Sequence, residues 1–120
     1  MASGTELFNA WKEALANKDS SRLAEFFTED FKFVGTVSQR NDTKQETLDW
    51  VASNANSNAI DNLEVIYENN EIAVVQHSAN NSNNNGVVIA VYTKGMANFL
   101  RLGLSEPSSK MWPHVPSGTF

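Results

Sequence analysis

The chain has 120 residues, of which 41% are hydrophobic and 19% are charged, and this length and composition fit one globular domain with a substantial core. The net charge of −5 comes from scattered residues, which excludes nucleic acid and anionic membranes as expected partners. With no cysteine and two histidines, neither a metal nor a cofactor is expected. The first residues show no basic segment followed by an apolar run, so we expect a cytoplasmic protein.

Two helical patterns precede the first predicted strand. Ser3 and Glu6 have the spacing of a capping box, and apolar residues then recur at helical intervals as far as about Asn17, namely Leu7, Phe8, Trp11, Ala14 and Leu15. Asp19 can cap a second, shorter helix that ends near Asp30 and presents one apolar face, formed by Leu23, Phe26 and Phe27.

A short strand and a third helix follow. The run Phe31–Gly35 alternates between apolar and polar residues, which predicts a strand with Phe31, Phe33 and Gly35 on one side. Thr43 and Glu46 repeat the capping-box spacing, and the helix that they begin carries an apolar stripe of Leu48, Val51, Ala52 and Ala55. Trp50 lies beside this stripe.

The second half of the chain predicts an antiparallel meander. Its four strands are runs rich in β-branched and aromatic residues, at 63–67, 72–76, 87–92 and 99–104. Turn residues separate them at Asn69-Asn70, at 80–86 and at Lys94-Gly95. The run 87–91 has no polar residue, so we expect both of its faces to be buried. The domain is predicted to span residues 1–105, and the proline-containing residues 106–120 are predicted to form an irregular tail.

The order of these elements resembles the nuclear transport factor 2-like superfamily, specifically its SnoaL-like branch. The resemblance is carried by residues 7–27 (LFNAWKEALANKDSSRLAEFF), 28–35 (TEDFKFVG), 47–51 (TLDWV), 67–77 and 91–101. It implies an α+β cone, in which helices pack on a strongly curved, mostly antiparallel sheet and a pocket opens between the first helix and the concave face. The turn at 94–98 departs from the Asp-Gly-Lys-Ile type that many relatives have there.

Ketosteroid isomerases share this fold, and the resemblance places their catalytic groups near Trp11, Gly35 and Ile89. Trp donates one hydrogen bond but cannot cycle a proton, while Gly and Ile supply neither an acid nor a base. The ketosteroid isomerase mechanism is therefore not expected.

His77 and Tyr92 are the candidate catalytic residues that remain. An imidazole on a central strand can act as a general base if it faces the cavity, although a strand histidine bonded to a neighbouring group is the more common case. Tyr92 can position a ligand or donate a hydrogen bond, or can simply pack across strands. Glu64, Glu68 and Glu71 are expected to face water.

A set of large apolar side chains is predicted to line the pocket, namely Trp11, Phe27, Phe33, Trp50, Ile89 and Phe99. If the cavity stays open, these residues form an apolar site with few polar groups. If the cavity is filled, they are the core of the domain.

Three functions follow as alternatives. The first is binding of a small, mostly apolar molecule. The second is an isomerase, cyclase or dehydratase with His77 as base and Tyr92 or Trp11 as donor. The third is a non-catalytic dimerisation or interaction module. Because helices can cover one face of the sheet and the run 87–91 is apolar on both, a homodimer that packs through the sheet is expected.

Overall fold

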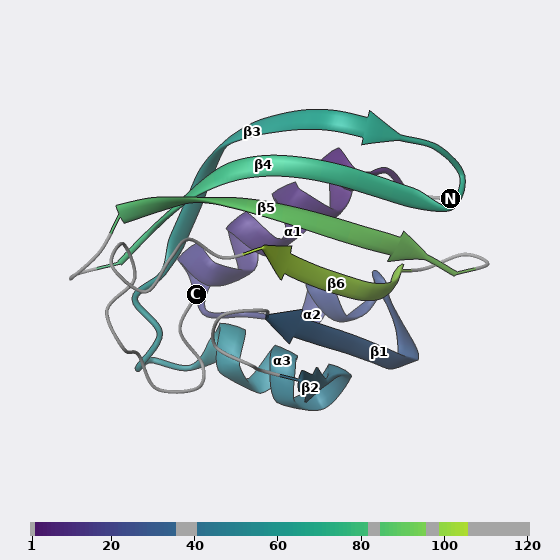
Figure 1. Cartoon of the computed structure of the whole chain (residues 1–120). Helices are drawn as coiled ribbons and strands as arrows, with labels where there is room; N and C mark the ends of the chain where they lie inside the picture. The colour runs from purple at the N-terminus through teal and green to yellow at the C-terminus, as the bar shows by residue number, and fades with distance from the viewer. Residues whose placement is uncertain (1, 36–40, 82–84, 96–98, 106–120) are drawn as a thin grey trace.

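The computed structural model of the chain describes residues 2–35, 41–81, 85–95 and 99–105, so the predicted tail at 106–120 lies outside the described residues. The elements in chain order are α1 (Gly4–Asn17), α2 (Ser21–Ala24), β1 (Phe27–Gly35), β2 (Asn41–Thr43), α3 (Lys44–Ala52), β3 (Ala59–Glu68), β4 (Ile72–Asn80), β5 (Asn85–Lys94) and β6 (Phe99–Ser105) (Figure 1).

The strands form one curved sheet in the order β2-β1-β6-β5-β4-β3, in which β1 runs parallel to β6 and the other neighbours are antiparallel. All three helices lie on the same side of this sheet, with α1 behind the strands in Figure 1. The side of the sheet that faces α1 is called the inner face below, and the other side the outer face. The α+β class and the meander from β3 to β6 are thus confirmed.

Both predicted capping boxes are present. At the start of α1, the Ser3 hydroxyl accepts from the Glu6 backbone N–H at 3.1 Å, while the Glu6 carboxylate accepts from the Ser3 N–H at 3.0 Å. Thr43 and Glu46 form the same pair of bonds at the start of α3, at 3.2 and 2.9 Å. These bonds satisfy N–H groups that the first turn of a helix otherwise leaves without partners.

The second helix is shorter than predicted. It ends at Ala24, and both Phe27 and Asp30 belong to β1. Phe27 pairs with Phe99 of β6, a contact distant in sequence that outweighs the local helical pattern. The Asp19 carboxylate accepts from the N–H and hydroxyl of Ser21, at 3.0 and 2.7 Å, rather than capping from the N-cap position, which is Ser20.

Two strand boundaries also differ from the prediction. The segment 41–43 forms β2, which pairs with residues 32–34 of β1 and had no strand signal of its own. Strand β3 begins at Ala59, inside a segment whose Asn and Ser content favoured turns, because Ala59 pairs with Asn80 at the far end of β4.

The prediction that both faces of the run 87–91 are buried is wrong for the single chain. Alternate residues of β5 point inward and are buried, namely Val88, Ala90 and Tyr92. The intervening side chains lie on the outer face and are 38–51% exposed, namely Val87, Ile89 and Val91. The outer face is exposed because all described helices lie on the inner side of the sheet. A run that is apolar at every position gives no indication of which of its two faces will be covered.

Glu68 anchors the start of α1 to the sheet, which corrects the expectation that it faces water. Its carboxylate accepts from the Gly4 backbone N–H at 2.9 Å and from the Lys94 ammonium at 2.7 Å. Lys94 also donates to the Asn69 carbonyl at 2.9 Å, and its side chain is 7% exposed. The Lys94 bond is the largest cause that lowers the Glu68 pKa below its ordinary value of 4.5.

Glu68→Gln is expected to lower the free energy of unfolding by about 2 kcal/mol at neutral pH, because it leaves a largely buried ammonium without its counter-ion. The folded Glu68 pKa is lowered, so its contribution is complete above the ordinary value of 4.5 and is lost as pH falls through the folded pKa. Urea unfolding at several pH values measures both effects. Glu64→Gln, at an exposed position of the same strand, is the control and should change little; equal losses in both variants would contradict the role of Glu68.

Candidate functional site

The space between α1 and the inner face, called the interior below, contains a cluster of aromatic rings. The Trp11 ring centroid lies 5.6 Å from that of Phe27 and 5.6 Å from that of Phe33. Phe27 in turn stacks on Phe31, with centroids 3.8 Å apart. Trp11 is 3% exposed, and the three phenylalanines are buried. These rings belong to the core, and α1 and β1 bring them together.

The Trp11 indole carries a hydrogen-bond donor that the interior does not satisfy. Its Nε1 atom is buried, and it has no hydrogen-bond partner among the residues that the structure describes. An unpaired buried donor costs about 1–3 kcal/mol, and most buried polar groups in folded proteins do have a partner. The neighbouring rings of Phe27 and Phe33 offer no acceptor of the usual kind. Trp11 therefore stands as a polar group within an apolar cluster.

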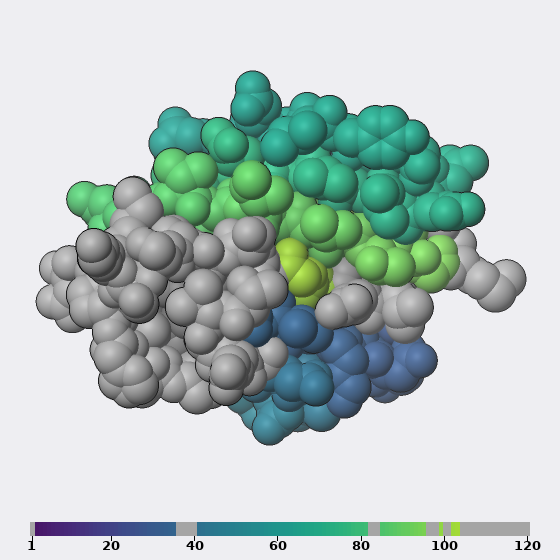
Figure 2. All heavy atoms as spheres, in the orientation of Figure 1, coloured from purple at the N-terminus to yellow at the C-terminus, as the bar shows by residue number. Residues whose placement is uncertain are grey.

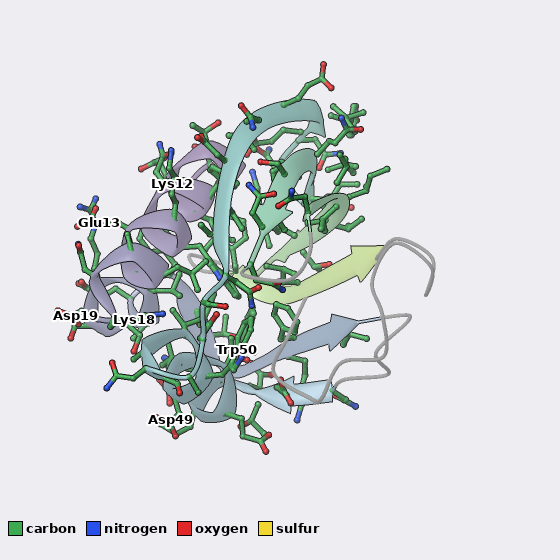
Figure 3. All side chains as sticks on the ribbon, turned by 90° about the vertical axis from the view of Figure 1, so that its left-hand side faces the viewer. Lys12, Glu13, Lys18, Asp19, Asp49 and Trp50 are labelled. Atoms are coloured by element: carbon green, nitrogen blue, oxygen red, sulfur yellow. The ribbon has the colours of Figure 1, made fainter. Side chains whose placement is uncertain are left out.

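Trp50 extends this cluster from the third helix. Its ring centroid is 6.3 Å from that of Phe33, and the residue is half-buried. In Figure 3, Trp50 lies on the side of α3 that faces the sheet, whereas Asp49 lies on the outside of the helix. The predicted pocket residues Trp11, Phe27, Phe33 and Trp50 are thus brought together.

Tyr92 and Phe99 form a second aromatic contact on the inner face. Their rings meet edge to face, with centroids 5.9 Å apart, and both are buried. Burial raises the pKa of the Tyr92 hydroxyl well above its ordinary value of 10.0. The hydroxyl therefore stays protonated at any working pH, so it can donate a hydrogen bond but cannot serve as a base.

Ile89 does not belong to the interior, which corrects the prediction that it lines the pocket. Strand alternation places it on the outer face of β5, where it is 39% exposed. Its neighbours along the strand, Val88 and Ala90, occupy the inward positions.

His77 faces the interior from β4 and is 4% exposed. Its ring centroid lies 5.2 Å from that of Phe8 on α1, and its Nδ1 lies 3.0 Å from the Ser78 carbonyl oxygen. Because a carbonyl oxygen accepts but does not donate, Nδ1 carries the proton in this contact, and the lone pair of the neutral ring is on Nε2. Burial lowers the His77 pKa from its ordinary value of 6.5, so the ring is neutral at neutral pH.

Phe8 connects His77 with the aromatic cluster. Phe8 and Trp11 are three residues apart on α1, so they share one face of the helix, and both are buried. Phe8 belongs to the apolar face predicted for the first helix but not to the predicted pocket. Phe31 was likewise left out of the predicted pocket, although the alternation of β1 placed it on the same side as Phe33.

The other polar groups in the described part of the chain form no comparable site. A hollow of about 140 Å³ lies between α1 and α2, but its charged residues Glu13, Asp19 and Arg22 are exposed. Within the described ranges, no three His, Cys, Asp or Glu side chains come together as metal ligands. None of the described helices is long and apolar enough to cross a membrane.

Comparisons of sequence identify no relative. No family model matches the chain, and no curated protein matches it.

Comparison of structures finds many similar proteins at low sequence identity. An NTF2-like protein of unknown function from Cytophaga hutchinsonii has a TM-score of 0.73 and 10% identity, over 93% of this chain and 96% of that one. A proposed polyketide cyclase from Xanthomonas campestris has a TM-score of 0.67 and 12% identity, over 90% and 92%. A hypothetical protein with a ketosteroid isomerase-like fold from Catenulispora acidiphila, in complex with trimethylamine, has a TM-score of 0.66 and 12% identity, over 91% of each chain.

The similarity extends over nearly the whole of each of these chains, and further matches include cystatin-fold and SnoaL-like proteins. At such low identity it establishes the fold and not the activity. The resemblance predicted from the sequence is confirmed at this level: the chain has the NTF2-like, cystatin-like α+β fold.

Proposed function

We propose that the protein binds a small, mostly apolar molecule in the interior between α1 and the inner face of the sheet. The observation that carries this proposal is the unpartnered Nε1–H of Trp11, which is buried among phenylalanine rings. A phenylalanine at this position would supply a similar apolar ring without an unsatisfied donor. A buried donor without a partner departs from the usual rule that buried polar groups are hydrogen-bonded, and such departures are expected at functional sites.

The surroundings of Trp11 agree with an apolar ligand. Aromatic and aliphatic side chains dominate the buried residues of α1, β1, β4 and β5, and among the described residues of these elements His77 is the buried residue classed as polar or charged. Ligand sites of this type combine an apolar lining with a small number of oriented polar groups. The Catenulispora acidiphila protein, which shares the fold, holds trimethylamine, and this supports the idea that such a protein can take up a small molecule.

An enzyme is the second candidate, and the geometry of His77 favours it. The bond from Nδ1 to the Ser78 carbonyl fixes the ring tautomer and leaves the Nε2 lone pair as a potential proton acceptor. A neutral imidazole inside a site is suited to general base catalysis, and Trp11 would supply the hydrogen bond to a substrate oxygen. The proposed polyketide cyclase among the similar structures favours an isomerase, cyclase or dehydratase acting on a cyclic apolar substrate.

Assembly into a homodimer is proposed from the outer face. Five apolar residues of β3, β4 and β5 lie there, and we call them the outer strip: Tyr67, Val74, Val87, Ile89 and Val91. Tyr67 is opposite Val74, and Val74 is opposite Val91, so the strip crosses three strands. Figure 2 shows the open face over these strands. A second copy packing on the strip would remove this apolar area from water.

Replacing Trp11 with Phe is expected to separate stability from binding. Without ligand, the variant loses packing around the smaller ring and gains from removal of the unpaired donor, so its stability should change by less than about 2 kcal/mol. Thermal unfolding with a panel of steroid-like, terpenoid and polyketide-like compounds should show smaller ligand shifts than in the wild type. Trp50→Phe is the matched control and should give no stabilisation. Ligand shifts in Trp11→Phe that equal those of the wild type would contradict the role of Trp11 in binding.

The lowered His77 pKa predicts a pH dependence of stability. Below pH 6.5 the unfolded chain binds a proton at His77 more readily than the folded chain, so the free energy of unfolding falls until the folded pKa is reached. His77→Gln should remove this part of the slope, as measured by denaturant unfolding at several pH values. If the protein is an enzyme, the same variant should reduce turnover by about 10²-fold or more. Identical pH slopes in both proteins would contradict a buried neutral His77.

The dimer proposal predicts that charges in the outer strip separate the subunits. Sedimentation of the wild type at micromolar concentration should give twice the chain mass, and Ile89→Lys combined with Val91→Lys should give a monomer with its fold retained. Asn9→Lys, on the exposed side of α1, is the control for added positive charge. A wild-type protein that sediments as a monomer at all concentrations would exclude this assembly.

A further inference from the structure

We propose that Asn85 is a site of spontaneous deamidation, at which its side-chain amide is converted to a carboxylate by reaction with the backbone of Gly86. Asparagine is among the thermolabile residues of proteins. Asn85 and Gly86 form the one Asn-Gly pair in the chain. The proposal is independent of the interior and of any molecule bound there, because both residues lie at the opposite end of β5 from the Lys94 contact with α1.

Gly86 supplies a nucleophile with little steric hindrance. Its backbone nitrogen loses its proton and attacks Cγ of Asn85, the Cγ–Nδ2 bond breaks, and ammonia leaves as a five-membered imide closes. Water then opens the imide at one of its two carbonyl groups and gives aspartate or isoaspartate, so neither an oxidant nor a reductant is consumed. A Cβ on the second residue would hinder this ring closure, and glycine has none.

The Asn85 side chain is exposed, and it makes no hydrogen bond with any residue that the structure describes. The two asparagines that precede serine differ in this respect. The Asn56 side chain donates to the Trp50 carbonyl at 3.3 Å and accepts from the Asn58 N–H at 2.8 Å. Asn81 donates to the Asn58 side chain at 3.1 Å. Their amides have to break these bonds before they can react, whereas the Asn85 amide does not.

Asn85 also lies where the sheet opens most easily. It is the first residue of β5, and with Asn80 it forms the last pair of the β4–β5 ladder, beside the pair of Gly86 with Ala79. The extended strand keeps the Gly86 nitrogen turned away from the Asn85 side chain, so ring closure requires these pairs to open. The end of a ladder opens at a small cost in free energy, without unfolding of the core.

The product changes the outer face of the sheet. Alternate residues of β5 are exposed there, so Asn85 continues the line of Val87, Ile89 and Val91. One new carboxylate takes the net charge of the chain from −5 to −6 and places that charge at the end of the outer strip. Isoaspartate also adds a carbon atom to the backbone of β5, which disturbs the pairing with β4.

Incubation of the full chain at physiological temperature and mildly alkaline pH, followed by tryptic digestion, tests the proposal. No Lys or Arg lies between residue 44 and residue 94, so one peptide carries Asn85 together with Asn56 and Asn81 as internal controls. Tandem mass spectrometry should show replacement of NH₂ by OH that accumulates at Asn85. Reaction at Asn56 and Asn81 should be slower by about tenfold or more, a barrier higher by about 1.4 kcal/mol.

Two variants and an unfolded control complete the test. Gly86→Ala should slow the reaction at Asn85 by about tenfold. Asn85→Gln, at an exposed position, should abolish it, because glutamine would have to close a larger ring. Urea should accelerate the reaction at Asn56 and Asn81 far more than at Asn85, since it removes their hydrogen bonds. Asn85 that stays intact while Asn56 or Asn81 reacts, or a wild-type rate in Gly86→Ala, would overturn the proposal.

Discussion

All three described helices lie on the same side of one curved sheet, and this constraint decides which side chains of each strand are enclosed. Alternation along β4 turns His77 toward α1, and alternation along β5 turns Tyr92 inward and Ile89 outward. The buried residues of the sheet and of α1 then form one continuous core. The aromatic cluster, the candidate site and the apolar outer strip all follow from this one-sided arrangement.

The charged contacts at the start of α1 fix this helix on the sheet. Glu68 receives hydrogen bonds from Gly4 and Lys94, so the end of β3, the end of β5 and the first turn of α1 meet at one carboxylate. From there α1 crosses the inner face, which brings Phe8 beside His77 and Trp11 beside the phenylalanines of β1. A change at this carboxylate should therefore influence the interior indirectly, through the placement of α1.

The local signals in the sequence were enough to predict the capping boxes at Ser3 and Thr43, the meander and the fold, because they depend on residues close together in the chain. Strand pairing between distant residues could not be predicted. The pairing of Phe27 with Phe99 places Phe27 in β1 rather than in the predicted helix. For the site, the sequence left open whether His77 faces the interior, because alternation groups the residues of a strand without showing which group the helices cover. The outward position of Ile89 was likewise open, because an uninterrupted apolar run gives no indication of which face is covered. The unpaired donor of Trp11 could not be predicted either, since it depends on which residues surround the indole in the folded chain.

The proposed binding of a small molecule depends most directly on the state of the Trp11 indole N–H. Its proton and nitrogen chemical shifts can be measured by NMR on ¹⁵N-labelled protein, with Trp11→Phe used to assign the signal among the three tryptophans. Without ligand, we expect the upfield proton shift of an indole that makes no hydrogen bond, and a downfield displacement when a carbonyl compound is bound. A signal that is already downfield without ligand, and that no ligand moves, would contradict the central claim that this donor is held free for a bound molecule.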